Sequence, residues 1–175
     1  MKAKKEDKPL REGYTTGSCA TAATKAALLS LITGEVQKEA TIKLPMGRIV
    51  TFSMEQCEVK ENMGFAEIIK DAGDDPDATH GARIQSTVTW KDTPGIEIDG
   101  GVGVGRVTKP GLPVPVGEAA INPVPRKMLY NVAEEVLKEH GSNRGIKIII
   151  SVPEGEEMAK KTLNGRLGIL GGFLF

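Results

Sequence analysis

The sequence predicts an α+β fold in which a mixed, largely antiparallel sheet carries two long helices on one face, as a two-layer sandwich. Two segments have helical patterns, residues 18–33 and 123–140. Several shorter segments alternate, or run apolar, over strand-sized lengths. One pair of these segments flanks a short turn, as in a β-hairpin.

The composition is that of an ordinary globular chain. Of its 175 residues, 39% are hydrophobic and 26% are charged, which argues against a disordered or fibrous protein. Lys plus Arg and Asp plus Glu both number 23, so the formal net charge is zero. No global field therefore favours nucleic acid or an anionic membrane as a partner, and recognition of an anion must be local.

Cysteine usage and apolar run lengths indicate a cytoplasmic setting. Cys19 and Cys57 are too few for a disulfide framework or a zinc site, and a reducing compartment follows. The longest apolar runs are strand-sized, so we expect no membrane partner. Residues 1–9 are expected to form a flexible basic segment, and residues 10–175 the α+β domain.

The first helix has small or apolar side chains at helical spacing, namely Ala20, Ala23, Ala27 and Leu31. Such a surface suits close packing against something flat, and Gly34 is expected to end the helix. Residues 40–44 and 48–54 follow. Both alternate with period two around a Pro-Met-Gly turn and predict a half-buried hairpin.

The middle of the chain predicts further strands separated by polar or glycine-rich loops. The strand candidates are residues 56–59, 64–71, 83–90 and 96–98. A loop dense in turn formers, residues 72–81, lies between the second and the third. The fourth leads into a long irregular connection over residues 99–113, and long connections are commonly functional.

The last third predicts a second helix, a buried strand, a short helix and a final strand. The second helix is amphipathic, with Asn122 placed to cap it and Pro123 at its first position. Residues 146–152 read as the buried strand. Residues 153–163 predict the short helix, with acids in its first turn, and residues 165–175 a glycine-punctuated apolar strand.

Four segments carry side chains suited to ligand binding. The first consists of the residues around the start of the first helix, Thr15, Thr16, Gly17 and Ser18. Free backbone N–H groups, a positive dipole end and hydroxyls suit a carboxylate or a phosphate. Plain helix capping is the alternative explanation of the same residues.

The second segment is the polar loop, with Asp74, Asp75, Asp77, Thr79 and His80. Its carboxylates and imidazole are suited to binding a hard cation, orienting a cationic ligand or accepting a proton. The spacing matches no metal signature, and turns and caps also explain the acids, so we predict no metal site. His80 is the better candidate for proton transfer than His140, which lies at the end of an exposed helix.

The third segment is the glycine loop, in which Gly101, Gly103 and Gly105 alternate with other residues. This spacing differs from the dinucleotide fingerprint G-x-G-x-x-G and does not open a helix, which excludes a Rossmann assignment. The glycines would let the backbone approach a flat ligand, with Arg106 and Lys109 at the rim to pair carboxylates. A glycine-kinked pair of strands is the alternative.

The fourth segment opens the second helix. Asn122 is suited to capping that helix, and Arg126 projects from its first turn. A cation at this position conflicts with the helix dipole, and a bound anion would offset the conflict.

Five stretches stand in a distinctive order: LREGYTTGSCA at residues 10–20, GDDPDATHG at 73–81, GGVGVGRVTKPGL at 100–112, AAINPVPRKM at 119–128 and SVPEG at 151–155. In content and order they resemble the CbiD family of cobalamin (vitamin B12) biosynthesis. The resemblance extends over essentially all of the chain beyond its lysine-rich start. It implies a cobalt-precorrin-5B C(1)-methyltransferase, which moves a methyl group from S-adenosylmethionine to carbon 1 of a cobalt tetrapyrrole and yields cobalt-precorrin-6A.

The resemblance also implies partners. The substrate would be an anionic tetrapyrrole that carries its own cobalt, so no protein metal site is implied. Family members continue past residues 167–172 into a further half, where we expect much of the S-adenosylmethionine site. The chain thus looks like the N-terminal half of a member, and the other half or a second chain is an expected partner.

The expected task of such an enzyme is to hold the donor methyl and the ring carbon in line. The carboxylates of the macrocycle would pair with the local cations Arg106, Lys109, Arg126 and Lys127. His80, Asp74, Asp75 or Asp77 would accept a proton. A non-catalytic module that binds a tetrapyrrole or a partner is the alternative, and a phosphate-binding enzyme using residues 15–18 is a third possibility.

Overall fold

A five-stranded sheet forms the centre of the computed structural model, which describes residues 13–73, 79–161 and 168–175. In spatial order its strands are β3 (Gln56–Lys60), β4 (Met63–Ile69), β5 (Arg83–Lys91), β9 (Gly145–Ser151) and β6 (Ile96–Gly100). β6 runs parallel to β9, and the other neighbours are antiparallel. The predicted mixed, largely antiparallel sheet is confirmed. The expected basic segment, residues 1–9, lies outside the described residues.

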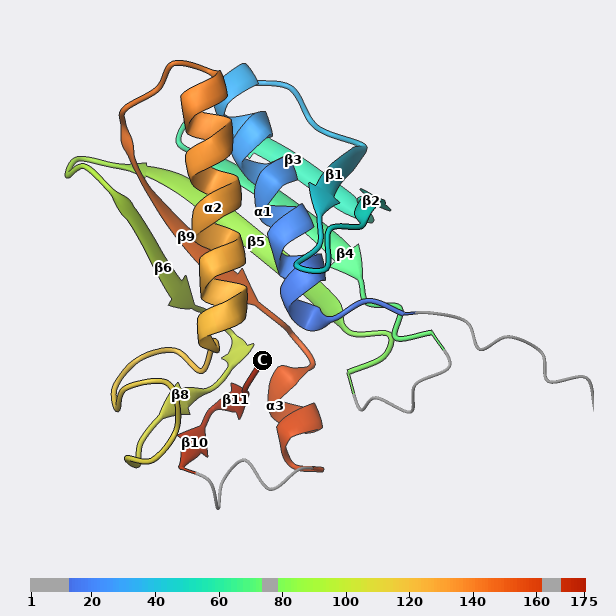
Figure 1. Cartoon of the computed structure of the whole chain (residues 1–175), viewed down its shortest axis with the longest axis vertical. Coiled ribbons are helices and arrows are strands. Elements are labelled where there is room, and N and C mark those ends of the chain that lie inside the picture. The colour runs from blue at the N-terminus through green and yellow to red at the C-terminus, as the bar shows by residue number, and fades with distance from the viewer. Residues whose placement is uncertain (1–12, 74–78, 162–167) are drawn as a thin grey trace, which may run out of the picture.

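Two long helices cover one face of this sheet (Figure 1). α1 (Thr16–Thr33) packs on β3, β4 and β5, and α2 (Pro123–Glu139) packs on α1 and β6. Beside α1 lies the predicted hairpin, formed by β1 (Glu39–Lys43) and β2 (Ile49–Ser53). α1 is therefore buried on nearly every side, which explains why all its residues except Lys25 are apolar or small.

The contact between α1 and the sheet depends on small side chains. Ala23 and Ala27 are fully buried, and the Thr24 and Ser86 hydroxyls join α1 to β5 at 2.7 Å. A Cβ atom at Gly64 of β4 would overlap the carbonyl oxygen of Ala27. Glycine at this position lets the helix backbone lie directly on the strand.

The rest of the described chain folds below the sheet, near the N-terminal ends of both long helices (Figure 1). It comprises β7 (Gly103–Val104), β8 (Arg106–Val107), α3 (Gly155–Ala159), β10 (Ile169–Leu170) and β11 (Gly172–Phe173). β8 pairs antiparallel with β10, and β7 pairs parallel with β11.

Two expectations for the C-terminal region were wrong. The apolar segment predicted as one strand over residues 165–175 forms two short strands, because Gly171 has a φ of 83° and redirects the chain between two partners. The short helix ends at Ala159 rather than at residue 163, since Lys161 N–H bonds to the carbonyl of Met158 in a tighter turn. Residues 162–167 lie outside the described part.

Gly64→Ala should destabilise the chain by about 1–3 kcal/mol, because the added methyl group forces α1 away from β4. Thr87→Ala is the control, since Thr87 pairs with Phe65 on the opposite face of the sheet. Urea unfolding followed by circular dichroism measures both. Equal stability of Gly64→Ala and the wild type would contradict the close helix–strand contact.

An exposed ion pair joins the start of β5 to the segment before α3. The Arg83 side-chain Nε lies 2.6 Å from Glu154 Oε1, and the Arg83 backbone N–H donates to Glu154 Oε2 at 3.2 Å. Partial burial raises the pKa of Glu154, but the hydrogen bonds from Arg83 and the backbone outweigh burial and leave it below its usual value.

Because that pKa is lowered by folding, the pair stabilises the protein above the unfolded-state pKa, and the contribution is lost as the pH falls through the folded-state pKa. Glu154→Gln should therefore lower stability slightly at neutral pH, and its difference from the wild type should shrink as the pH falls through the folded-state pKa of Glu154. Urea unfolding of both proteins at neutral pH and along a series of acidic pH values measures this. A stability difference that persists in acid would show that the ion pair is not its source.

Candidate functional site

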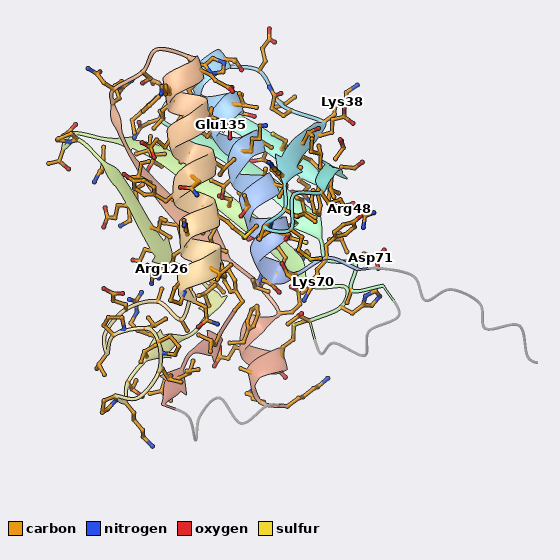
Figure 2. All side chains as sticks on the ribbon, viewed as in Figure 1. Lys38, Arg48, Lys70, Asp71, Arg126 and Glu135 are labelled. Atoms are coloured by element: carbon orange, nitrogen blue, oxygen red, sulfur yellow. The ribbon has the colours of Figure 1, made fainter. Side chains whose placement is uncertain are left out.

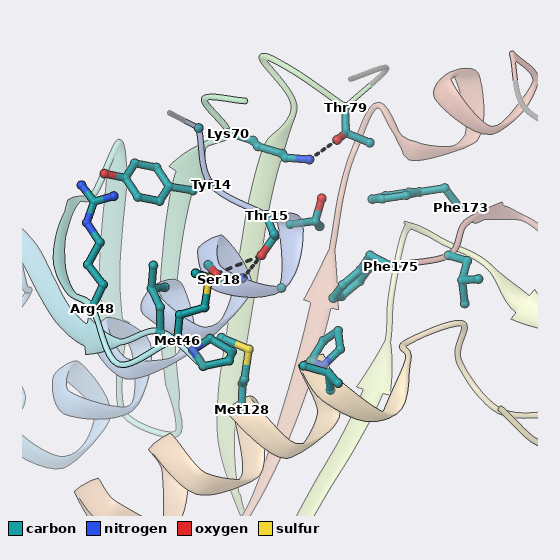
Figure 3. Close-up of a pocket in the computed structure, with 18 residues that line it drawn as sticks. Tyr14, Thr15, Ser18, Met46, Arg48, Lys70, Thr79, Met128, Phe173 and Phe175 are labelled. Carbon is teal, nitrogen blue, oxygen red and sulfur yellow. Dashed lines mark hydrogen bonds between the residues drawn. The ribbon is translucent and has the colours of Figure 1, made fainter. Parts of the chain in front are cut away.

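A cavity of about 840 Å³ lies where the N-terminal ends of α1 and α2 meet the hairpin and the C-terminal segment (Figure 3). Its volume is in the upper part of the range for ligand sites. The lining residues come from distant parts of the chain: Gly13, Tyr14, Thr15, Thr16, Gly17, Ser18, Leu44, Pro45, Met46, Arg48, Lys70, Thr79, Val124, Pro125, Met128, Phe173, Leu174 and Phe175.

The start of α1 gives the cavity a positive backbone end. Thr15 is the N-cap, and its hydroxyl accepts from the Ser18 N–H at 3.0 Å, so the capping expected as the alternative is present. The N–H groups of Thr16 and Gly17 donate to none of the described residues. The first turn contains no acid to neutralise the dipole, which leaves this end suited to an anion.

Lys70 adds a buried charge. It follows β4 directly, is only 3% exposed, and its Nζ donates to the Thr79 hydroxyl (Figure 3). Arg48, at the end of the hairpin turn, lines the same cavity from an exposed position. A cation in a site sheltered from water interacts more strongly with an anionic ligand than one on the open surface does.

The remaining walls are apolar and partly aromatic. Tyr14 packs edge-on against Phe52 with 4.9 Å between ring centroids, and the Phe173 and Phe175 rings lie 5.8 Å apart. Met46, 97% exposed at the hairpin tip, and Met128 complete this side. The cavity thus combines apolar, partly aromatic walls with positive groups, an arrangement suited to a large, flat anion.

The structure brings only part of the predicted site together. Thr15, Thr16, Gly17, Ser18 and Thr79 all line the cavity, although they come from two distant segments. Among the described residues, the other predicted positions do not line it: His80, Gly101, Gly103, Gly105, Arg106, Lys109, Asn122 and Arg126.

Other segments of this chain fill the space beside each glycine of the glycine loop. A Cβ atom at Gly101 would meet Ser151, one at Gly103 would overlap the carbonyl of Val152, and one at Gly105 would meet Ile169. We expected these glycines to let the backbone lie against a macrocycle. Here they let β7 and β8 lie against the segments that follow β9 and precede the C-terminus, so packing within the chain accounts for them.

Two of the predicted cations form hydrogen bonds within the chain. Arg106 donates to the Gly117 carbonyl and to Asp99, both at 2.9 Å. Partial burial raises the pKa of Asp99, but the hydrogen bonds from Arg106 and Gly100 N–H leave it lowered. Arg126 donates at 2.8 Å to the carbonyls of residues 121 and 119.

Lys109 and Asn122 lie outside the cavity as well. Lys109 is exposed, and its side-chain stem fills the space beside Gly168. Asn122 is the N-cap of α2 by position, but its side chain makes no capping bond, which corrects the prediction. Pro123 and Pro125 remove N–H donors from the first turn of the helix, and the Asn122 N–H donates to the Phe175 carbonyl at 2.6 Å.

The acidic loop is described only at its ends, and Asp74, Asp75 and Asp77 lie outside the described residues. His80 is half-exposed, and its Nδ1 accepts from the Ala72 N–H at 3.0 Å. In a neutral imidazole the other nitrogen then carries the proton. To accept a proton, His80 would have to give up this hydrogen bond.

Sequence reasoning missed Lys70, Arg48 and the aromatic end of the chain as site residues. Lys70 had a signal, because a lysine directly after a buried strand and before a polar loop is unusual. Arg48 and Phe173 had none, since a hairpin turn and an apolar segment reveal nothing about what they will face.

The described residues offer little support for a reactive thiol, a metal site or a membrane-spanning helix. Burial raises the pKa of the Cys19 thiol to about 12, which keeps it protonated and unreactive. Within residues 13–73, 79–161 and 168–175, no three His, Cys, Asp or Glu side chains gather as metal ligands would. Over the same residues, no helix is both long and apolar enough to cross a membrane.

The chain is similar to known proteins over nearly all its length. The CbiD family model matches residues 3–174. Cobalt-precorrin-5B C(1)-methyltransferases from Priestia megaterium and Geobacillus sp. (strain WCH70) are 71% and 69% identical over 96% and 94% of the chain. These alignments span 46% and 45% of the relatives, so the chain covers somewhat less than half of their length.

A solved structure has a fold similar to that of this chain. The 1.9 Å crystal structure of a cobalamin biosynthesis protein (CbiD) from Archaeoglobus fulgidus is 32% identical, with a TM-score of 0.72. The match covers 95% of this chain and 52% of that one. By family model, sequence identity and fold alike, this chain belongs to the CbiD family.

Proposed function

We propose that the chain supplies the tetrapyrrole-binding half of a cytoplasmic cobalt-precorrin-5B C(1)-methyltransferase. In this reaction S-adenosylmethionine methylates ring carbon 1 and gives cobalt-precorrin-6A on the route to cobalamin. The names of the relatives support the reaction class. Because the chain spans less than half of their length, we place the donor site mainly in the remaining part of such enzymes and treat that part as the partner of this chain.

The cavity at the start of α1 carries this proposal. Its aromatic and thioether walls suit the face of a macrocycle, while the α1 N-terminus, Lys70 and Arg48 suit carboxylate arms. The chain as a whole has no net charge, so this local concentration of positive groups is what would select an anion. Cobalt enters only as part of the substrate.

The methyl transfer needs alignment more than activation. The sulfur–methyl bond breaks as the bond to ring carbon 1 forms; the ring supplies the electron pair, and the sulfur keeps its own in S-adenosylhomocysteine. The enzyme gains most by holding the two reactants in line and excluding water. No covalent intermediate with the protein is required.

The proton acceptor is proposed among His80, Asp74, Asp75 and Asp77. All four belong in sequence to residues 72–81, the segment that also contains Thr79, and Thr79 lines the cavity. A carboxylate fits the role better than His80, whose Nδ1 is already engaged by the Ala72 N–H.

Lys70→Met should weaken tetrapyrrole binding at least about tenfold, because it removes a buried cation while nearly keeping the side-chain volume. Lys38→Met is the control, since Lys38 is exposed near the opposite end of α1 (Figure 2). Fluorescence titration with uroporphyrin, a stable polycarboxylate tetrapyrrole, measures both affinities. Unchanged affinity in a folded Lys70→Met protein would remove the cavity as the binding site.

A chimaera tests the reaction itself. In the chimaera, residues 1–175 replace the matching part of the Priestia megaterium relative. This protein should still transfer a methyl group to cobalt-precorrin-5B, measured as S-adenosylhomocysteine formed and as product mass. Lys70→Met in the chimaera should lower kcat/KM at least about tenfold, and Lys38→Met should not. A folded chimaera that binds the tetrapyrrole without methylating it would favour a non-catalytic binding module.

A further inference from the structure

A second hollow of about 600 Å³ adjoins the cavity, between α1, α2 and the hairpin. The two share four lining residues, Leu44, Pro45, Val124 and Met128, and so lie side by side. We call the second hollow the lysine trough. Its further lining residues are Thr21, Lys25, Thr41, Ile42, Lys43, Lys127, Asn131, Val132 and Glu135.

The trough is locally positive. Lys25, Lys43 and Lys127 line it from three different elements, and Glu135 is the single acid among its lining residues. On α2, Lys127 and Glu135 share one face two turns apart, and Val124 and Met128, which face both hollows, lie beside Lys127. Figure 2 shows Glu135 far along α2 from Arg126, the neighbour of Lys127. The positive end of the trough is therefore the end nearer the cavity.

Two of the three lysines have side chains with no polar partner among the described residues. The Lys25 ammonium donates to the Thr41 carbonyl at 2.7 Å. The ammonium groups of Lys43 and Lys127 form no hydrogen bond or ion pair with any described residue. Lys127 also lies near the N-terminus of α2, where the first turn contains no acid and the helix dipole disfavours a cation. A bound anion would relieve this conflict.

We propose that the lysine trough is a second anion subsite, which binds carboxylate arms of the tetrapyrrole whose ring occupies the cavity. The inference rests on the proposed function and extends it, because it assigns the ligand's remaining charges to Lys43 and Lys127. A macrocycle with arms around its whole rim cannot satisfy all of them at the α1 N-terminus and Lys70. The trough is the adjoining hollow that offers uncommitted cations.

The test compares two porphyrins that differ mainly in charge. Uroporphyrin carries twice as many carboxylates as coproporphyrin on the same ring. Lys43→Met and Lys127→Met should each weaken uroporphyrin binding about threefold, and the double variant about tenfold, because partly exposed ion pairs contribute modestly and nearly additively. Coproporphyrin binding should change less, and the salt dependence of uroporphyrin binding should become shallower.

Lys138→Met is the matched control, since Lys138 lies in the last turn of α2, away from both hollows. If the trough variants bind both porphyrins like the wild type while Lys70→Met binds them weakly, the subsite is refuted and the cavity proposal stands. If the trough variants lose affinity and Lys70→Met does not, the trough binds anions but the cavity proposal fails. If the wild-type chain binds neither porphyrin, both proposals fail.

Discussion

The direct contact between α1 and β4 is the constraint on which the rest of the structure depends. At Gly64 the helix backbone lies on the strand, and Ala23 and Ala27 of α1 are fully buried. The same strand leads into Lys70, and the same helix begins at the cavity. Because both elements are rigid, the contact at Gly64 sets where the buried cation lies relative to the positive end of the helix.

The cavity concentrates positive potential without a basic protein around it. Both long helices direct their N-terminal ends toward it, and neither first turn contains an acid. Gly17 of α1 allows the close approach of Pro125 of α2, since a Cβ atom there would lie 3.1 Å from the proline Cβ. Two helix dipoles, Lys70 and Arg48 therefore act on one volume, while the apolar walls keep the local dielectric low.

The glycine loop shows how a functional interpretation and a packing interpretation can share one pattern. Glycines at alternate positions indicate a close approach of backbone to something flat. In this structure the backbone that the glycines approach belongs to the same chain. Gly103 lies against Gly155 and Gly172, where three chain segments cross. The loop still serves the site, because the crossing holds β11 and the phenylalanines that follow Gly172 at the cavity wall.

Local patterns in the sequence were sufficient for the helices, the hairpin and the mixed sheet, because period, caps and turns depend on near neighbours. They also pointed to the α1 start and to Thr79 as candidates, and the structure places both at the cavity wall. The sequence did not reveal that Lys70, Arg48 and Phe173 face one volume, or that Arg126 bonds to backbone carbonyls. Only the tertiary structure decided these points, because the strand order and the helix crossing determine which distant side chains meet, and neither leaves a periodic signal in the chain.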